Sequence, residues 1–208
     1  LTAFGLACII VGGSMVLTPW NPVPEPSVKG MLEGSCLNVE ALLEEFEAEE
    51  KAVYLPPSED RTYSYIPLSS NSGNLDLEKV TSAPRRIITD SGGSPGLFVF
   101  PPGAELIRNS GIDRSMGLEA ALSFVLVDFV EVVDSVEVLR EMDEIEVRLR
   151  DPKLNTDFTT YRRVLGSIPT SIAGSILAYS IDSPVRFTGE RREEKETIAR
   201  FRVVSESG

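Results

Sequence analysis

The sequence predicts an α+β fold, in which an N-terminal transmembrane helix precedes a mixed domain of β-hairpins and packed helices. Three observations lead to this prediction. The first charged residue is Glu25, paired segments of alternating apolar and polar residues recur along the rest of the chain, and apolar segments of helical length separate these pairs. We place the transmembrane helix at residues 1–20, a proline-rich linker at 21–36 and the α+β domain at 37–205.

The N-terminal segment LTAFGLACIIVGGSMVL is predicted to cross a membrane. As a helix it would rise roughly 26 Å, close to the hydrocarbon core of about 30 Å. Trp20 follows as an interfacial anchor would, and no A-x-A-like cleavage site of a signal peptide is present. A buried helix of a soluble domain and a signal peptide are the alternatives. Because the chain opens on Leu, we expect its natural N-terminus to lie further upstream.

The side of the membrane is left open by the residues alone. Lys29 is the cation nearest to the predicted span, which weakly favours the outside. The chain has no N-x-[ST] sequon, and Cys8 and Cys36 lie in segments that are not expected to meet as a disulfide. Both features weakly favour the cytoplasm.

The linker and the first half of the domain follow in order. Four prolines in TPWNPVPEPS predict an extended spacer. Ser35 or Asn38 can then cap a helix that reaches Lys51, with an apolar face and an acidic, solvated one. Four strands are predicted next, in two pairs: AVYLP with TYSYIPL, and RRIIT with GLFVFPP. The loop at 91–96 is a candidate boundary between two subdomains.

The second half of the domain alternates helices and hairpins. AELIRN predicts a short helix, and residues 117–133 predict a longer core helix that carries too many acidic residues for a second span. SVEVLRE and EIEVRLR alternate with period two and predict a hairpin with one wet face. Pro169 fits the first turn of a helix over 170–181. The segment PVRFTGERREEKETIARFRVV predicts a final hairpin with a charged tip.

Composition excludes several function classes. The chain has 208 residues, a formal net charge of −12 and no histidine. Its cations form isolated pairs, so we expect no nucleic-acid partner. Two cysteines without a CxxC motif and without histidine argue against a zinc or iron–sulfur site, and no cofactor motif is present.

Two short motifs deserve a chemical interpretation. Residues 92–96 match G-x-S-x-G, but Pro95 follows the serine and no histidine base exists, so we interpret them as a turn. A second stretch, GSIPTSIAGS, places hydroxyl groups at a helix N-terminus just after two arginines. This pattern indicates a contact with an anion or ligand, through Arg162, Arg163, Ser167, Thr170 and Ser171. Close helix packing, through Gly174 and Ala178 and through Ser171 and Ser175, is the alternative, and it is the one that we favour.

The chain resembles a family of uncharacterised archaeal membrane-anchored proteins that is widespread in haloarchaea. The resemblance rests on LTPWNP, NVEALLEEF, KAVYLPP, YSYIPL, LFVFPPGAEL and GSIPTSIAGSILAYSIDSPV. It implies that a coiled coil and a first span precede this chain, which places the domain on the cytoplasmic side. The C-terminal part is also faintly similar to vinyl-4-reductase-type ligand-binding domains, although the cysteines usual near that turn are missing here.

These observations together predict a membrane-tethered, non-enzymatic binding or sensing module. Its partners would be the lipid bilayer, through residues 1–20, and a protein or small ligand. An enzyme that uses carboxylate or serine chemistry without histidine is one alternative, and a structural scaffold is another. No catalytic, cofactor-binding or metal-ligating residue can be named from the sequence.

Overall fold

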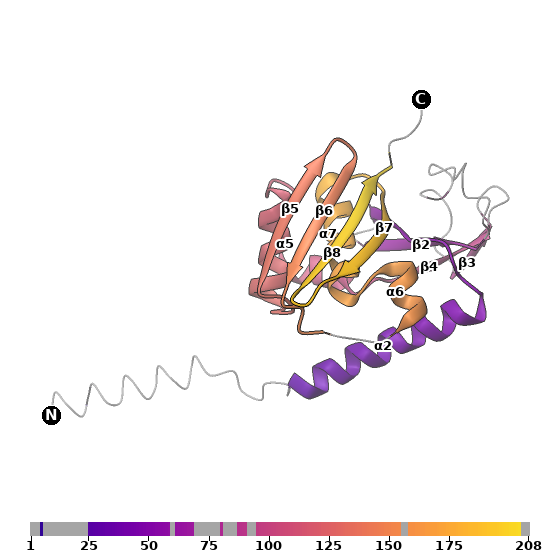
Figure 1. The fold of residues 1–208 in the computed structure, drawn as a ribbon, viewed down its shortest axis with the longest axis horizontal. Helices are drawn as coiled ribbons and strands as arrows, with labels where there is room; N and C mark the ends of the chain where they lie inside the picture. The colour runs from indigo at the N-terminus through magenta and orange to yellow at the C-terminus, as the bar shows by residue number, and fades with distance from the viewer. Residues whose placement is uncertain are drawn as a thin grey trace. The chain divides into compact units, whose positions relative to one another are not determined.

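The computed structural model describes residue 5 and residues 25–58, 61–68, 80, 87–90, 95–154 and 158–204. The chain divides into two units, Leu1–Ser35 and Cys36–Gly208. The described part of the second unit is a mixed α+β structure, as predicted, and it is shown in Figure 1. The predicted membrane span at residues 1–20 lies outside the described residues, except for Gly5, which is helical.

The described strands form one antiparallel sheet in the order β3-β4-β2-β1-β7-β8-β6-β5. Four strand pairs predicted from the alternating segments are confirmed, because β1–β2, β3–β4, β5–β6 and β7–β8 are all antiparallel neighbours. The strands are β1 (Val53–Ser58), β2 (Arg61–Pro67), β3 (Ile88–Asp90), β4 (Pro95–Val99), β5 (Ser135–Glu141), β6 (Glu144–Arg150), β7 (Val185–Arg192) and β8 (Glu196–Val203).

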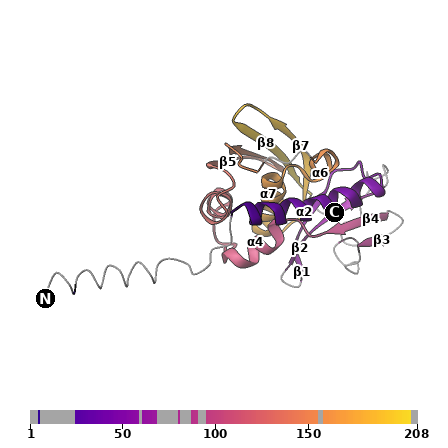
Figure 2. The ribbon, with the colours of Figure 1, turned by 90° about the horizontal axis from the view of Figure 1, so that it is seen from below.

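Helix α7 (Ile168–Ile181) is the centre of the core. The two halves of the sheet join where β1 meets β7, through only two residue pairs, Val53 with Arg186 and Tyr54 with Val185. In Figure 2, α7 lies between these halves, with β7 and β8 on one side and β1 and β2 on the other. Eleven consecutive residues of α7, from Ile168 to Ala178, are buried. This explains why the helix is apolar around its whole circumference rather than on one face.

The two halves of the sheet differ in how much water they meet. Strand β6 alternates buried and more exposed residues, so the predicted hairpin β5–β6 does have one wet face. In β2, by contrast, every residue after Arg61 is buried. One of its faces packs in a cluster with Val80 and Phe98. Burial on both faces explains why β2 carries so many aromatic and β-branched side chains.

The predicted linker at 21–36 is wrong from residue 25 onward, and residues 21–24 lie outside the described residues. Helix α2 spans Glu25–Glu45 and therefore starts well before Ser35. Pro26 lies in its first turn, where a missing N–H costs nothing and the fixed φ angle suits a helix. The helix also ends before the predicted Lys51, since Glu47 has a φ of 47° and the chain becomes extended towards β1.

The predicted helix at 117–133 is shorter and less regular than expected. It consists of α5 (Leu118–Ser123) and a π-helix, η2 (Phe124–Phe129). The preceding short helix is confirmed as α4 (Gly103–Ser110). An additional short helix, α6 (Thr159–Leu165), was not predicted. Within the described residues, only the segment Thr159–Ile181 is long and apolar enough to cross a membrane, and 78% of its most apolar window is buried, as in a core helix.

The loop at 91–96 does not separate two subdomains. Residues 91–94, including the serine of the G-x-S-x-G match, lie outside the described residues. The strands on either side, β3 and β4, pair directly with one another. Both belong to the same sheet within the unit Cys36–Gly208, so a boundary at this point is ruled out.

Candidate functional site

The predicted contact residues lie around the junction of α6 and α7. Gly166 ends α6 with a φ of 83°, a conformation that glycine adopts without strain. Ser167 then precedes α7, and Pro169 occupies its first turn as predicted. A Cβ atom at position 166 would lie 2.4 Å from Cγ2 of Thr170, so this tight junction requires glycine for space as well.

A carboxylate of the chain itself fills the N-terminal end of α7. Nε of Arg162 donates to Oε1 of Glu190 over 2.8 Å, and the backbone N–H of Ser167 donates to Oε2 over 2.8 Å. The hydroxyl of Thr170 donates to the same Oε2, and the hydroxyl of Ser167 donates to Oγ1 of Thr170 over 3.0 Å. The Glu190 side chain is only 3% exposed. Three of the predicted contact residues are therefore arranged around an anion, but an internal one.

Sequence reasoning missed Glu190 because a β-bulge changes its direction. Phe187 pairs with Phe201 on the buried face of the sheet, so strict alternation would turn residue 190 outward. The register shifts between Phe187 and Gly189, and Glu190 instead pairs with the buried Ala199. An extra residue in one strand sends the following side chains to the opposite face. Gly189, next to the bulge, was the only local signal.

A second carboxylate caps α6 in the same manner. Oε1 of Glu40, on α2, accepts the backbone N–H of Thr160 over 3.0 Å, and Oε2 accepts the N–H of Tyr161. The first N–H groups of a helix have no partner within the helix, and a carboxylate there also complements the helix dipole. At the N-termini of both α6 and α7, the position that an external anion would occupy is thus filled by a carboxylate of the chain itself.

Ser171 does not belong to this network. Its Oγ accepts a hydrogen bond from the hydroxyl of Tyr54 over 3.0 Å, in a fully buried position. The same hydroxyl lies 2.7 Å from the carbonyl oxygen of Leu165. Burial raises the pKa of Tyr54, so the phenol stays neutral.

The packing alternative for the small residues of α7 agrees with the structure. A Cβ atom at Gly174 would lie 2.5 Å from the ring of Tyr54. On another side of the helix, a Cβ atom at Gly103 of α4 would lie 2.6 Å from Cβ of Ser175. These distances show that the small side chains let a strand and a second helix approach α7 closely.

Arg163 faces a different environment from Arg162. One of its Nη atoms donates to the carbonyl oxygen of Ala48 over 3.2 Å, and its own carbonyl oxygen accepts a hydrogen bond from Nζ of Lys51. Nζ of Lys51 also lies 5.3 Å from the centre of the Phe187 ring, a cation–π contact. Burial lowers the pKa of Lys51, the positive charge of Arg163 lowers it further, and the nearby Glu190 acts in the opposite direction.

These cations line an open depression between α6 and β7. Its volume is about 400 Å³, within the range of about 300–1,000 Å³ typical of small-molecule sites. The lining combines cationic, aromatic and polar side chains, namely Lys51, Arg162, Arg163, Phe158, Phe187, Thr159 and Glu190. We call this feature the cationic depression. Lys51, Phe158 and Phe187 were not among the predicted contact residues.

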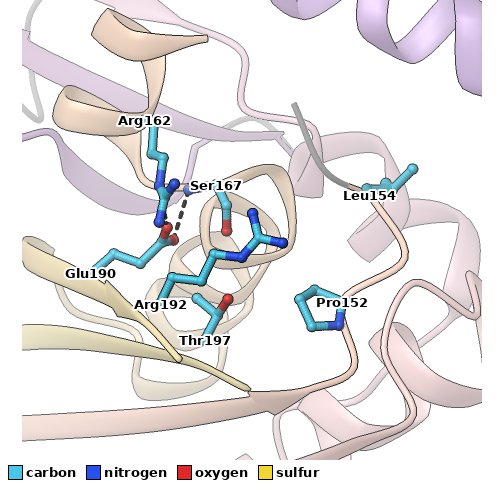
Figure 3. Close-up of a pocket in the computed structure, with 7 residues that line it drawn as sticks. All are labelled: Pro152, Leu154, Arg162, Ser167, Glu190, Arg192 and Thr197. Atoms are coloured by element: carbon cyan, nitrogen blue, oxygen red, sulfur yellow. Dashed lines mark hydrogen bonds and ion pairs between the residues drawn. The ribbon is translucent and has the colours of Figure 1, made fainter. Parts of the chain in front are cut away.

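A much smaller cavity also borders on Glu190, and Figure 3 shows the residues that line it. Its volume is about 10 Å³, which accommodates roughly one water molecule. Ser167, Glu190 and Arg192 line it, together with Thr197, which pairs with Arg192 across β7 and β8. Although a hydroxyl and a carboxylate meet here, the cavity has no room for a substrate.

The described residues contain no group of three or more His, Cys, Asp and Glu side chains placed to hold a metal ion. No family model matches the chain, and no significant similarity to a curated protein or to a solved structure was found. The resemblance to an archaeal membrane-anchored family therefore stays a prediction.

Proposed function

We propose that this chain is a membrane-tethered, non-enzymatic module that binds a small ligand in the cationic depression at the cytoplasmic face. The observation that carries the proposal is the depression itself. It gathers Lys51, Arg162 and Arg163 in a chain whose formal net charge is −12. The partly buried Phe158 beside a few convergent polar groups is typical of ligand sites.

The tether is proposed from the sequence. Residues 1–17 carry no charge, and Trp20 follows as an interfacial anchor would. The cytoplasmic location rests on the family resemblance, in which an even number of spans precedes the domain. Membrane attachment would keep the binding domain close to a surface without contributing to the site.

Binding is favoured over catalysis because the reactive groups near α7 are already engaged. The carboxylate of Glu190 accepts three hydrogen bonds, and the hydroxyls of Ser167 and Thr170 point to one another and to that carboxylate. A nucleophile needs a base with a free lone pair and space for a substrate beside it. The adjoining cavity holds about one water, so it supplies neither.

Two measurements on the full chain test the proposal. The full chain should be recovered in the membrane fraction, whereas a chain that starts at residue 25 should be recovered in the soluble fraction. In lipid nanodiscs, hydrogen exchange should slow at residues 158–165 and 185–192 when a member of a small-molecule library binds. Arg163→Gln should abolish this protection, and Arg191→Gln, an exposed arginine outside the depression, should not. A library that protects other segments only would contradict the proposed site.

A further inference from the structure

The charges that line the cationic depression do not balance. Lys51, Arg162 and Arg163 contribute three positive charges, and Glu190 contributes one negative charge. Arg162 directly pairs with Glu190, which leaves the other two cations without an acidic partner among the residues that line the depression. Two like charges that share a site repel one another unless an anion joins them; here Lys51 is half-buried and Arg163 is exposed.

Within the part of the chain that the structure describes, the hydrogen-bonding capacity of these cations is also largely unused. Arg162 donates to Glu190, Arg163 donates to the carbonyl oxygen of Ala48, and Lys51 donates to the carbonyl oxygen of Arg163. An arginine carries five N–H donors and a lysine three. Most donors at this site are therefore available to a ligand that carries several acceptor oxygens.

Phosphate matches this arrangement better than a carboxylate does. A phosphate monoester carries a charge of about −1.5 to −2 at pH 7 and three strong acceptor oxygens. Its charge complements the two positive charges that Glu190 leaves uncompensated, whereas a carboxylate would compensate only one. Arginine guanidinium groups are suited to phosphate through paired N–H donors, and lysine contributes a point charge.

The aromatic side chains indicate what the phosphate is attached to. Phe158 and Phe187 line the same depression as the three cations. The volume of about 400 Å³ leaves space for an organic group beside the phosphate. Phe187 is fully buried, with Nζ of Lys51 5.3 Å from the centre of its ring, so Phe158 is the aromatic side chain that an organic group would contact.

We infer that the cationic depression binds the phosphate group of a phosphate monoester, with Lys51, Arg162 and Arg163 on the phosphate and Phe158 on its apolar part. The inference rests on the proposed function and adds the chemical class of the ligand. Such a phosphate is carried both by soluble organic phosphates and by lipid headgroups of the phosphatidic acid type.

Isothermal titration calorimetry on the full chain in phosphatidylcholine nanodiscs tests this inference, with phenyl phosphate as the probe. We expect phenyl phosphate to bind more tightly than benzoate or inorganic phosphate. Arg163→Gln and Lys51→Gln should each weaken its binding roughly tenfold or more, since each removes a charged hydrogen-bond partner. Arg191→Gln, which lies outside the depression, should bind as the unmodified chain does. Circular dichroism shows whether each variant is folded.

A second arm distinguishes the two sources of phosphate. Nanodiscs that contain phosphatidic acid should weaken phenyl phosphate binding if the lipid headgroup occupies the site, and should leave it unchanged if the ligand is soluble. Equal binding of benzoate, or binding that survives both substitutions in folded variants, would overturn the inference. If phenyl phosphate fails to bind while a different compound of the small-molecule library still slows hydrogen exchange at residues 158–165, the inferred ligand class is wrong and the proposed binding function stands. If nothing protects the depression, both are wrong.

Discussion

The substitution Glu190→Gln offers the sharpest test of the internal anion at α7. It keeps the size and shape of the side chain but removes its charge. Three donors then face an amide instead of a carboxylate: Nε of Arg162, the N–H of Ser167 and the hydroxyl of Thr170. One of the amide's two polar atoms is itself a donor, so at least one of these three contacts is lost.

The expected cost follows from two contributions. Loss of a side-chain cap at a helix N-terminus costs about 1 kcal/mol. The ion pair with Arg162 contributes about as much again, because the Arg162 side chain is 38% exposed and solvent screens part of the attraction, although Glu190 itself is buried. We therefore expect the free energy of unfolding to fall by about 2 kcal/mol. For a chain of this size that lowers the melting temperature by roughly 4–8 °C.

Thermal unfolding of the full chain in detergent, followed by circular dichroism, measures this change. Glu193→Gln is the matched control, because Glu193 pairs with Arg191 over 2.6 Å at a position where both side chains are largely exposed. Exposed pairs of this kind contribute little, so the control should melt as the unmodified chain does. A Glu190→Gln variant that melts together with this control would refute the reasoning. Higher salt should also leave the difference between the two variants largely intact, since Glu190 is shielded from solvent.

Four further outcomes are expected. In a urea titration, Gly174→Ala should lower the free energy of unfolding by about 1–3 kcal/mol, because its Cβ would lie 2.5 Å from the ring of Tyr54. Gly189→Ala is the control for this variant. It should be close to neutral, because no atom lies within 4 Å of the added Cβ. Tyr54→Phe should cost about 1–3 kcal/mol in that titration, since it leaves two buried partners of the hydroxyl unsatisfied. Burial raises the pKa of Tyr54 and of Tyr161 in the folded chain, so these two groups should not change stability below a pH of about 10 and should lower it above that pH, as the unfolded chain ionises first. A Tyr54→Phe and Tyr161→Phe double variant, measured from pH 8 to 11, should lose this contribution. A pH dependence identical to that of the unmodified chain would contradict the assignment. Removal of residues 1–24 should yield a monodisperse domain without detergent in size-exclusion chromatography, and persistent aggregation would count against the tether.

The strand pairs were predictable because their signal is local. Alternation in EIEVRLR places Ile145, Val147 and Leu149 on one face, and that face is buried in the structure. Pro169 likewise marked the first turn of α7 without knowledge of its neighbours. Such patterns depend only on the periodicity of the backbone, so they hold wherever the element is placed.

The candidate site was predictable only in part. Arg162, Ser167 and Thr170 were recognised as groups suited to an anion, because a helix N-terminus and hydroxyl side chains have this property in any context. Nothing in the sequence showed that the bulge in β7 would turn Glu190 onto them. Lys51 joins the same region from a position more than a hundred residues away in the chain.

The order of residues alone thus decided the α+β class, the hairpins and the chemical character of the α6–α7 junction, since each of these follows from local periodicity, turn residues and helix termini. Tertiary structure decided the order of the strands, the burial of β2 on both faces and the identity of the anion at α7. Tertiary structure also decided which cations line the cationic depression. These features arise from contacts between segments that are distant in the chain, and the free energy of such contacts depends on how the elements pack, which no local pattern records.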